Sequence, residues 1–133
     1  MASPIGEVNL KTLLESLQPQ LHPAVFVFST LKTGESLPSD ITPICQFQEA
    51  EGLTLIVEQD QADRAGLAYL YACRMITLTV HSSLDAVGLL ATVTQALAAA
   101  NISVNAISAY YHDHLFVACD RAEAAMACLE KIR

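Results

Sequence analysis

Residues 75–80 read MITLTV and residues 81–88 read HSSLDAVG, and this stretch decides how the 133-residue chain folds. The first six residues have the character of a strand, and the next eight resemble a polar loop that ends at a glycine. An apolar pattern with helical spacing then runs to Ala100, followed by strand-like residues over 102–110 and 114–119. Strand, loop, helix, strand, turn and strand make up the first two-thirds of a βαββαβ unit.

The two helices of this half are predicted from their apolar faces. The first is expected over residues 86–100, with its start capped by Asp85 and its end formed by Asn101 in the left-handed conformation. Its apolar stripe consists of Leu89, Val93, Ala96, Leu97 and Ala100. The second is expected to begin at Asp120, with Glu123 completing a capping box. Its buried face consists of Ala122, Ala125, Met126, Leu129 and Ile132.

The N-terminal half alternates in a similar way. A helix capped by Asn9 is predicted over residues 9–17, after which Pro19 and Pro23 are expected to interrupt regular structure. Strands are predicted over 24–29, 44–48 and 53–58. A short helix over 60–66, ended by Gly66, then leads into an extended segment over 69–80.

Each half is therefore an incomplete βαββαβ unit. The C-terminal half has no last strand, and the N-terminal half opens on a helix with no strand before it. We predict an α+β fold of two ferredoxin-like units side by side, with strands shared or exchanged between the halves. The predicted units are residues 1–68, with an extra strand around 41–49, and residues 69–133. The alternative is a single irregular α+β domain around a three-stranded core.

Composition excludes several classes of partner. The net charge of −7, with scattered Lys and Arg, argues against a nucleic-acid surface. No apolar run approaches the roughly 18 residues that span a bilayer.

The first seven residues lack the features of a signal peptide, so a cytoplasmic location is expected. The four cysteines form no Cys-x-x-Cys pair, and we interpret them as reduced core residues: Cys45, Cys73, Cys119 and Cys128.

Three groups of residues next to the predicted helix are candidates for a small-molecule site, and the third is the hairpin tip at residues 110–114 (YYHDH). The loop over residues 81–88 ends in Gly88, where backbone N–H groups at the helix start favour a carboxylate. Ser103, Asn105 and Ile107 share one face of the next strand by period-two alternation. Without a ligand, the loop is an ordinary strand-to-helix turn, and the strand face is solvated or lies at a dimer seam.

Motifs for catalysis or cofactor binding are absent from the sequence, so no cofactor is expected. His112 and His114 would lie on the same side of an extended strand, which makes a metal pair conceivable. No further ligand has suitable spacing, however, and a polar hairpin tip is the simpler interpretation.

Residues 85–91 (DAVGLLA) and 101–108 (NISVNAIS) resemble the ACT domain, which has an Asp-x-Pro-Gly-like loop, a helix and a Gly-Ile-Asn-Ile-like second strand. Val87 stands where proline is common and Asn101 where glycine is common. Residues 51–55 (EGLTL), 81–89 (HSSLDAVGL) and 110–117 (YYHDHLFV) resemble the small stand-alone bacterial proteins built from two ACT-like units.

This resemblance implies a regulatory module without catalytic activity that binds a free amino acid next to a neighbouring unit and acts on a regulated enzyme. The binding residues that it implies are Ser82, Ser83, Asp85, Val87, Gly88, Ser103 and Asn105. Exposed sheet edges and a small core make a homodimer the expected assembly. The alternatives are a ligand-free interaction module and, less favoured, a metal-binding protein that uses His112 and His114.

Overall fold

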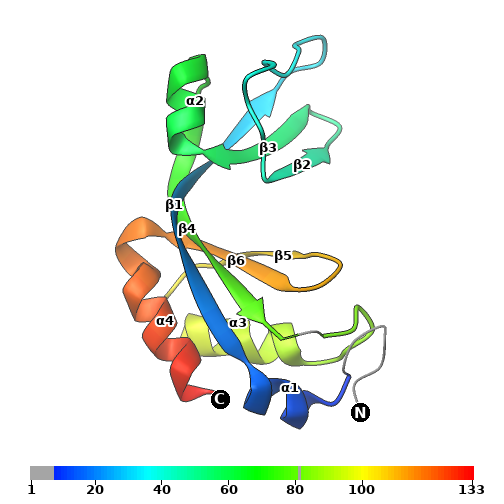
Figure 1. Cartoon of the computed structure of the whole chain (residues 1–133), viewed down its shortest axis with the longest axis vertical. Helices are drawn as coiled ribbons and strands as arrows, with labels where there is room; N and C mark the ends of the chain where they lie inside the picture. The colour runs from blue at the N-terminus through cyan, green and yellow to red at the C-terminus, as the bar shows by residue number, and fades with distance from the viewer. Residues whose placement is uncertain (1–7, 81) are drawn as a thin grey trace. The chain divides into compact units, whose positions relative to one another are not determined.

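The computed structural model describes residues 8–80 and 82–133. The first seven residues and His81, which entered the signal-peptide and loop predictions, lie outside the described residues. In chain order the elements are α1 (Leu10–Ser16), β1 (Gln18–Leu31), β2 (Cys45–Gln48), β3 (Leu53–Glu58), α2 (Gln59–Ala65), β4 (Tyr69–Thr79), α3 (Leu89–Ala99), β5 (Asn105–Ser108), β6 (Asp113–Ala118), a 3₁₀ turn η1 (Cys119–Arg121) and α4 (Ala122–Lys131) (Figure 1).

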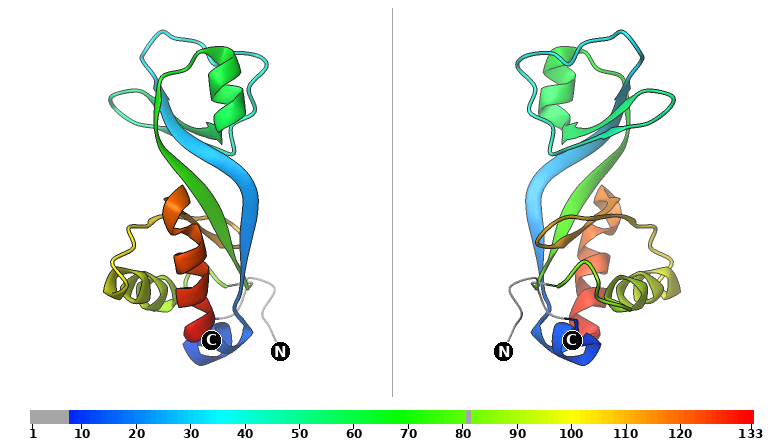
Figure 2. Two further views of the ribbon diagram at one scale, coloured as in Figure 1. Left: turned by 90° about the vertical axis from the view of Figure 1, so that its left-hand side faces the viewer. Right: turned by 90° about the vertical axis from the view of Figure 1, so that its right-hand side faces the viewer.

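Two long strands, β1 and β4, belong to both of the compact units of the chain. The boundary crosses β1 after His22 and β4 after Cys73, so that unit 2 is Pro23–Cys73 and unit 1 is the described remainder. The two strands are neighbours in the sheet and run beside one another (Figure 2). The prediction of an α+β fold with two units that share strands is confirmed. The predicted boundary near residue 68 stays a prediction.

Unit 1 has the strand order β1-β4-β6-β5, with α3 and α4 packed on one face (Figure 1). Read along the chain from β4, it is a βαββαβ unit whose last strand is the first part of β1. The N-terminal segment thus supplies the strand that is missing after α4.

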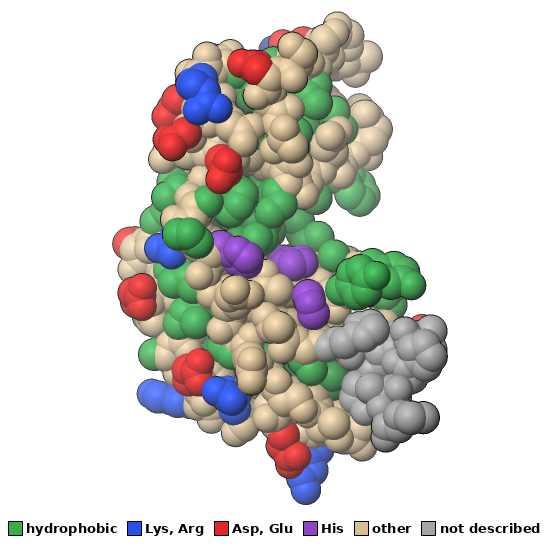
Figure 3. All heavy atoms as spheres, in the orientation of Figure 1, with side chains coloured by type: hydrophobic (Ala, Val, Ile, Leu, Met, Phe, Trp, Pro, Cys, Tyr) green, Lys and Arg blue, Asp and Glu red, His purple; other side chains and the backbone are tan. Residues whose placement is uncertain are grey.

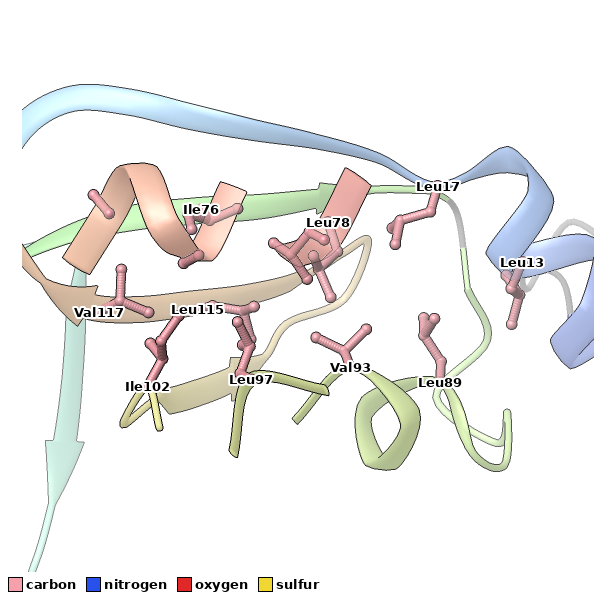
Figure 4. Packing of buried hydrophobic residues seen from close by; sticks show 13 residues of the cluster. Leu13, Leu17, Ile76, Leu78, Leu89, Val93, Leu97, Ile102, Leu115 and Val117 are labelled. Carbon is pink, nitrogen blue, oxygen red and sulfur yellow. The ribbon is translucent and has the colours of Figure 1, made fainter. Parts of the chain in front are cut away.

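The core of unit 1 lies between this sheet and its helices. Leu89, Val93 and Leu97 project from α3 toward Leu78 and Leu115 of the strands (Figure 4). All five side chains are at most 3% exposed. Burying a leucine side chain contributes about 1.5–3 kcal/mol, so this layer is what holds α3, and the loop before it, in place. The apolar faces predicted for α3 and α4 are confirmed in their main positions.

Unit 2 has the order β2-β3-β1-β4, which is again that of a βαββαβ unit. Residues 32–44 form a loop where such a unit has its first helix, and α2 is the second helix. Gly66 ends α2 in the left-handed conformation, as predicted. A smaller core fills this unit, made of Val27, Leu31, Ile41, Leu55, Val57 and Ala62.

The prediction that Pro19 and Pro23 interrupt regular structure before a strand at 24–29 is wrong, because β1 begins at Gln18 and includes both prolines. β3 pairs with β1 only from Phe26 onward. Both prolines therefore lie where β1 has a neighbour on one side, and there a missing N–H is tolerated.

Three local expectations about element ends are also corrected. Helix α3 begins at Leu89 with Gly88 as its N-cap, so Asp85 does not cap it. Helix α4 follows the 3₁₀ turn and has Arg121 at its N-cap position without a side-chain cap, so the capping box is not formed. The strand predicted over residues 102–110 is shorter in the structure. Residues 101–104 are not part of it, because there the chain places the Ile102 side chain in the core before β5 begins.

No described helix is long and apolar enough to cross a bilayer.

Candidate functional site

The loop between β4 and α3 is closed by its own hydrogen bonds. The hydroxyl of Ser83 accepts a hydrogen bond from the Asp85 amide at 3.0 Å, and the Ser83 carbonyl accepts one from the Ala86 amide at 3.0 Å. The Ser83 side chain is buried, with 7% of its surface exposed. The Ser83 hydroxyl therefore fixes the shape of the loop.

Among the described residues, no side chain caps the start of α3. Gly88 has φ = 100°, its position makes no side-chain cap, and the first turn of the helix contains no acidic residue. The first N–H groups of a helix have no partner within the helix, and the helix dipole adds positive character there. These amides can donate hydrogen bonds to a carboxylate or another small anion.

A cavity of about 170 Å³ lies beside this loop, within unit 1. On one side it is bounded by the loop and the start of α3, and on the other by the turn between β5 and β6. Its lining consists of Ser82, Ser83, Leu84, Ala86, Leu89, Leu90, Ser108, Ala109 and Asp113. The wall is mixed, because three serines and one carboxylate lie among the leucine and alanine side chains.

Of the polar pair on the hairpin side, Asp113 belongs to the hairpin tip named among the candidates, whereas Ser108 was not predicted as part of the site. Ser108 and Asp113 face each other across the β5–β6 hairpin, and the Ser108 hydroxyl donates a 2.5 Å hydrogen bond to Asp113 Oδ1. Asp113 is half-buried. The signal was present in the alternation of the two strands, because the register that pairs Ala106 with Leu115 also pairs Ser108 with Asp113.

Of the residues implied for binding, Ser82 and Ser83 line this cavity and the others do not. Asp85 is exposed, and Val87 is 83% exposed. Gly88 supports the helix start rather than the cavity wall. Ser103 is exposed before β5, and Asn105 is the exposed first residue of β5, opposite Phe116. A role for these residues in binding stays a prediction.

The described histidines gather on one face of the molecule (Figure 3). The Thr77 hydroxyl lies 2.8 Å from His22 Nε2 and 2.9 Å from His114 Nδ1, so one hydroxyl links imidazoles of β1 and β6. His112 Nδ1 lies 3.2 Å from the Val80 carbonyl oxygen. Burial lowers the pKa of His114 below its ordinary value of 6.5, the charges of His112 and His22 lower it further, and that of Asp113 opposes them.

This arrangement gives little support to a metal site. One ring nitrogen of His112 and one of His114 are engaged with protein oxygens, and the ring centroids are 6.3 Å apart. Within the described ranges, no group of three or more His, Cys, Asp or Glu side chains is arranged to hold a metal ion.

Comparison with solved structures places this fold among known proteins. A protein of unknown function from Vibrio cholerae, described as a possible transport protein, is 42% identical, with a TM-score of 0.81 over 92% of this chain and 94% of that chain. The ligand-free regulatory subunit of aspartate kinase from Thermus thermophilus is 12% identical, with a TM-score of 0.67 over 89% and 97%. Aspartate kinase from Clostridium acetobutylicum is 9% identical, with a TM-score of 0.65 over 96% of this chain and 36% of that one. The last two show a likeness of fold.

No protein with a curated functional description matches the chain. Models of the ACT domain match residues 5–74 and residues 71–131. Because the first of these matches alone covers more than half of the sequence, the chain belongs to the ACT domain family.

Proposed function

We propose that this protein is a regulatory module, without catalytic activity of its own, that binds a free amino acid in the cavity beside α3. The observation that carries the proposal is the pairing of two kinds of polar group around one small space. Uncapped amides at the start of α3 suit a carboxylate, and Ser108 and Asp113 on the opposite side suit an amino group.

The family and the fold support the same proposal. The likeness in fold to the regulatory subunit of aspartate kinase agrees with a module that acts on an enzyme rather than as one. We therefore propose a regulated enzyme as partner and a cytoplasmic location, where the four free cysteines would stay reduced.

Thermal-shift and calorimetric titrations of the full chain with each of the twenty amino acids test this function. A ligand at 100 times its dissociation constant should stabilise the protein by about 2.7 kcal/mol. The proposal is wrong if no amino acid shifts the melting temperature or gives a binding isotherm at millimolar concentration.

A matched pair of variants locates the site. Ala109 lines the cavity, whereas Ala98 is an exposed residue of α3 that does not. Ala109→Trp should weaken binding at least tenfold, and Ala98→Trp should leave it unchanged. Equal binding by both variants would show that the amino acid does not bind in this cavity.

A second candidate is an interaction module that needs no ligand. Four large apolar side chains of the same two loops are more than half exposed, namely Leu84, Val87, Tyr110 and Tyr111. Exposed apolar groups of this kind are typical of interaction surfaces, and a homodimer is the assembly that we propose for it. Light scattering of the full chain and of Tyr110→Ser/Tyr111→Ser tests this candidate, because the variant should dissociate. Unchanged assembly would exclude these tyrosines from the interface.

A further inference from the structure

Among the described residues that line the cavity beside α3, Asp113 is the single charged one. Neither of the two ion pairs among the described residues involves it, since these join Lys11 to Glu15 and Arg133 to Glu130. The described part of the lining therefore contributes one negative charge and no positive side chain to balance it. A bound molecule that brings an ammonium group would supply that balance.

The hairpin holds this carboxylate in a defined position. Asp113 is the first residue of β6, and its Oδ1 accepts the 2.5 Å hydrogen bond from the Ser108 hydroxyl. Both residues line the cavity. A hydrogen bond to an ionised carboxylate is stronger than a neutral one. Ser108 is thus placed to orient Asp113 before any ligand arrives.

The size and walls of the cavity restrict the rest of the molecule. A volume of about 170 Å³ is roughly the space of six water molecules at ~30 Å³ each. Leu84, Leu89 and Leu90 line it, so a short aliphatic side chain fits better than a charged one. A second carboxylate on the ligand would be repelled by Asp113, and none of the described lining residues is a cation that could offset this repulsion.

We propose that Asp113 is the specificity-determining residue of this site, that it binds the ammonium group of a small neutral amino acid, and that Ser108 positions it. This inference rests on the proposed function, because it concerns the same cavity. It makes a sharper claim, since the 2-hydroxy acid of the same shape, which lacks the ammonium group, should be rejected.

Calorimetric titration of the full chain with L-alanine and L-lactate, and with glycine and glycolate, tests the claim without any variant. Each amino acid should bind at least tenfold more tightly than its hydroxy acid. L-phenylalanine, with its larger side chain, and L-aspartate, with its second carboxylate, should also bind at least tenfold more weakly than L-alanine. Equal binding within the first two pairs would overturn the ammonium claim, and tight binding of phenylalanine would overturn the size class.

Two variants then assign the residues. Asp113→Asn keeps an acceptor for Ser108 and should reduce the preference for L-alanine over L-lactate at least tenfold, whereas Asp120→Asn, on the exposed 3₁₀ turn, should not. Ser108→Ala keeps the carboxylate and should reduce the preference a few-fold, so the claim stays testable if Asp113→Asn folds poorly. An unchanged preference in both site variants contradicts the role of Asp113, whereas failure of every amino acid to bind contradicts the proposed function itself.

Discussion

A Cβ atom on Gly88 would lie 3.2 Å from Cδ2 of Leu10, so the start of α3 packs directly against α1. Gly88 also has φ = 100°, a conformation that other residues adopt only at a cost. The glycine therefore serves two purposes at once. It lets the chain turn into the helix beside the candidate cavity, and it leaves room for the α1 side chain beneath.

We expect Gly88→Ala to destabilise the chain by about 2 kcal/mol, through backbone strain plus the displacement of Leu10. Gly34 is a matched control, because it has φ = 94° and open space around its Cβ position. Gly34→Ala should therefore cost about 1 kcal/mol, from strain alone. Urea denaturation measures both. In a Leu10→Ala background, Gly88→Ala should cost no more than Gly34→Ala does. A larger cost at Gly88 in that background would exclude the packing explanation.

The same region shows where sequence reasoning succeeds and where it stops. The apolar stripe through Leu89, Val93 and Leu97 was predicted because helical periodicity reports burial directly. Shared or exchanged strands were predicted from the two incomplete units, and the structure shows that β1 and β4 each belong to both units. Features that depend on the periodicity of one element or on the number of strands in a unit could thus be predicted from the sequence.

The cavity was only partly accessible in this way. Ser82 and Ser83 were predicted from the loop, but Ser108 and Asp113 reach the cavity through the register of a hairpin. That register depends on which residues form the turn, and the second strand was predicted to be longer than β5 is. A shift of one residue would turn these side chains to the other face of the sheet, so their position depends on tertiary structure.

Asn101 has φ = 60° and ends α3, as its sequence position predicted. Glycine adopts this conformation without strain, whereas alanine does not. Asn101→Gly should therefore be neutral or stabilising by up to ~1 kcal/mol, and Asn101→Ala should cost about 1 kcal/mol. Thermal and urea unfolding without ligand provide the measurement.

Asn105, an exposed residue of β5, is the control for that pair. In an extended strand glycine is the worse residue, so the order should reverse, with Asn105→Gly less stable than Asn105→Ala. The same order at both positions would mean that the left-handed conformation of Asn101 does not govern the result.

The stability of the fold should depend on the protonation of His114. Its pKa is lowered in the folded protein, mainly by burial, so the unfolded chain binds a proton more readily. The contribution of His114 is therefore fully present above its unfolded pKa near 6.5 and is lost as the pH falls through that value toward the folded pKa. Urea denaturation should give a lower unfolding free energy at pH 5.5 than at pH 7.5.

The variant His114→Asn isolates this contribution, because an amide can replace Nδ1 as a partner of Thr77 but does not titrate. His22 and His112 are present in both proteins, so the comparison changes His114 alone. The variant should lose less stability between pH 7.5 and pH 5.5 than the parent. An identical pH dependence would show that His114 does not contribute.

Thr77 and Thr79 lie two residues apart on the same face of β4 but differ in their hydrogen bonding. The Thr77 hydroxyl is buried and joined to His22 and His114, whereas the buried Thr79 hydroxyl has no partner among the described residues. Replacement by valine keeps the shape and the β-branch of either side chain. Thr77→Val should destabilise the chain by about 1–3 kcal/mol, because it leaves two imidazole nitrogens without their partner. Thr79→Val should be neutral or stabilising by up to ~1 kcal/mol, because it removes a buried hydroxyl that makes no hydrogen bond. Urea denaturation at pH 7.5 compares the two variants directly, and equal losses of stability would contradict the assignment of Thr77 as the hydroxyl that joins β1, β4 and β6.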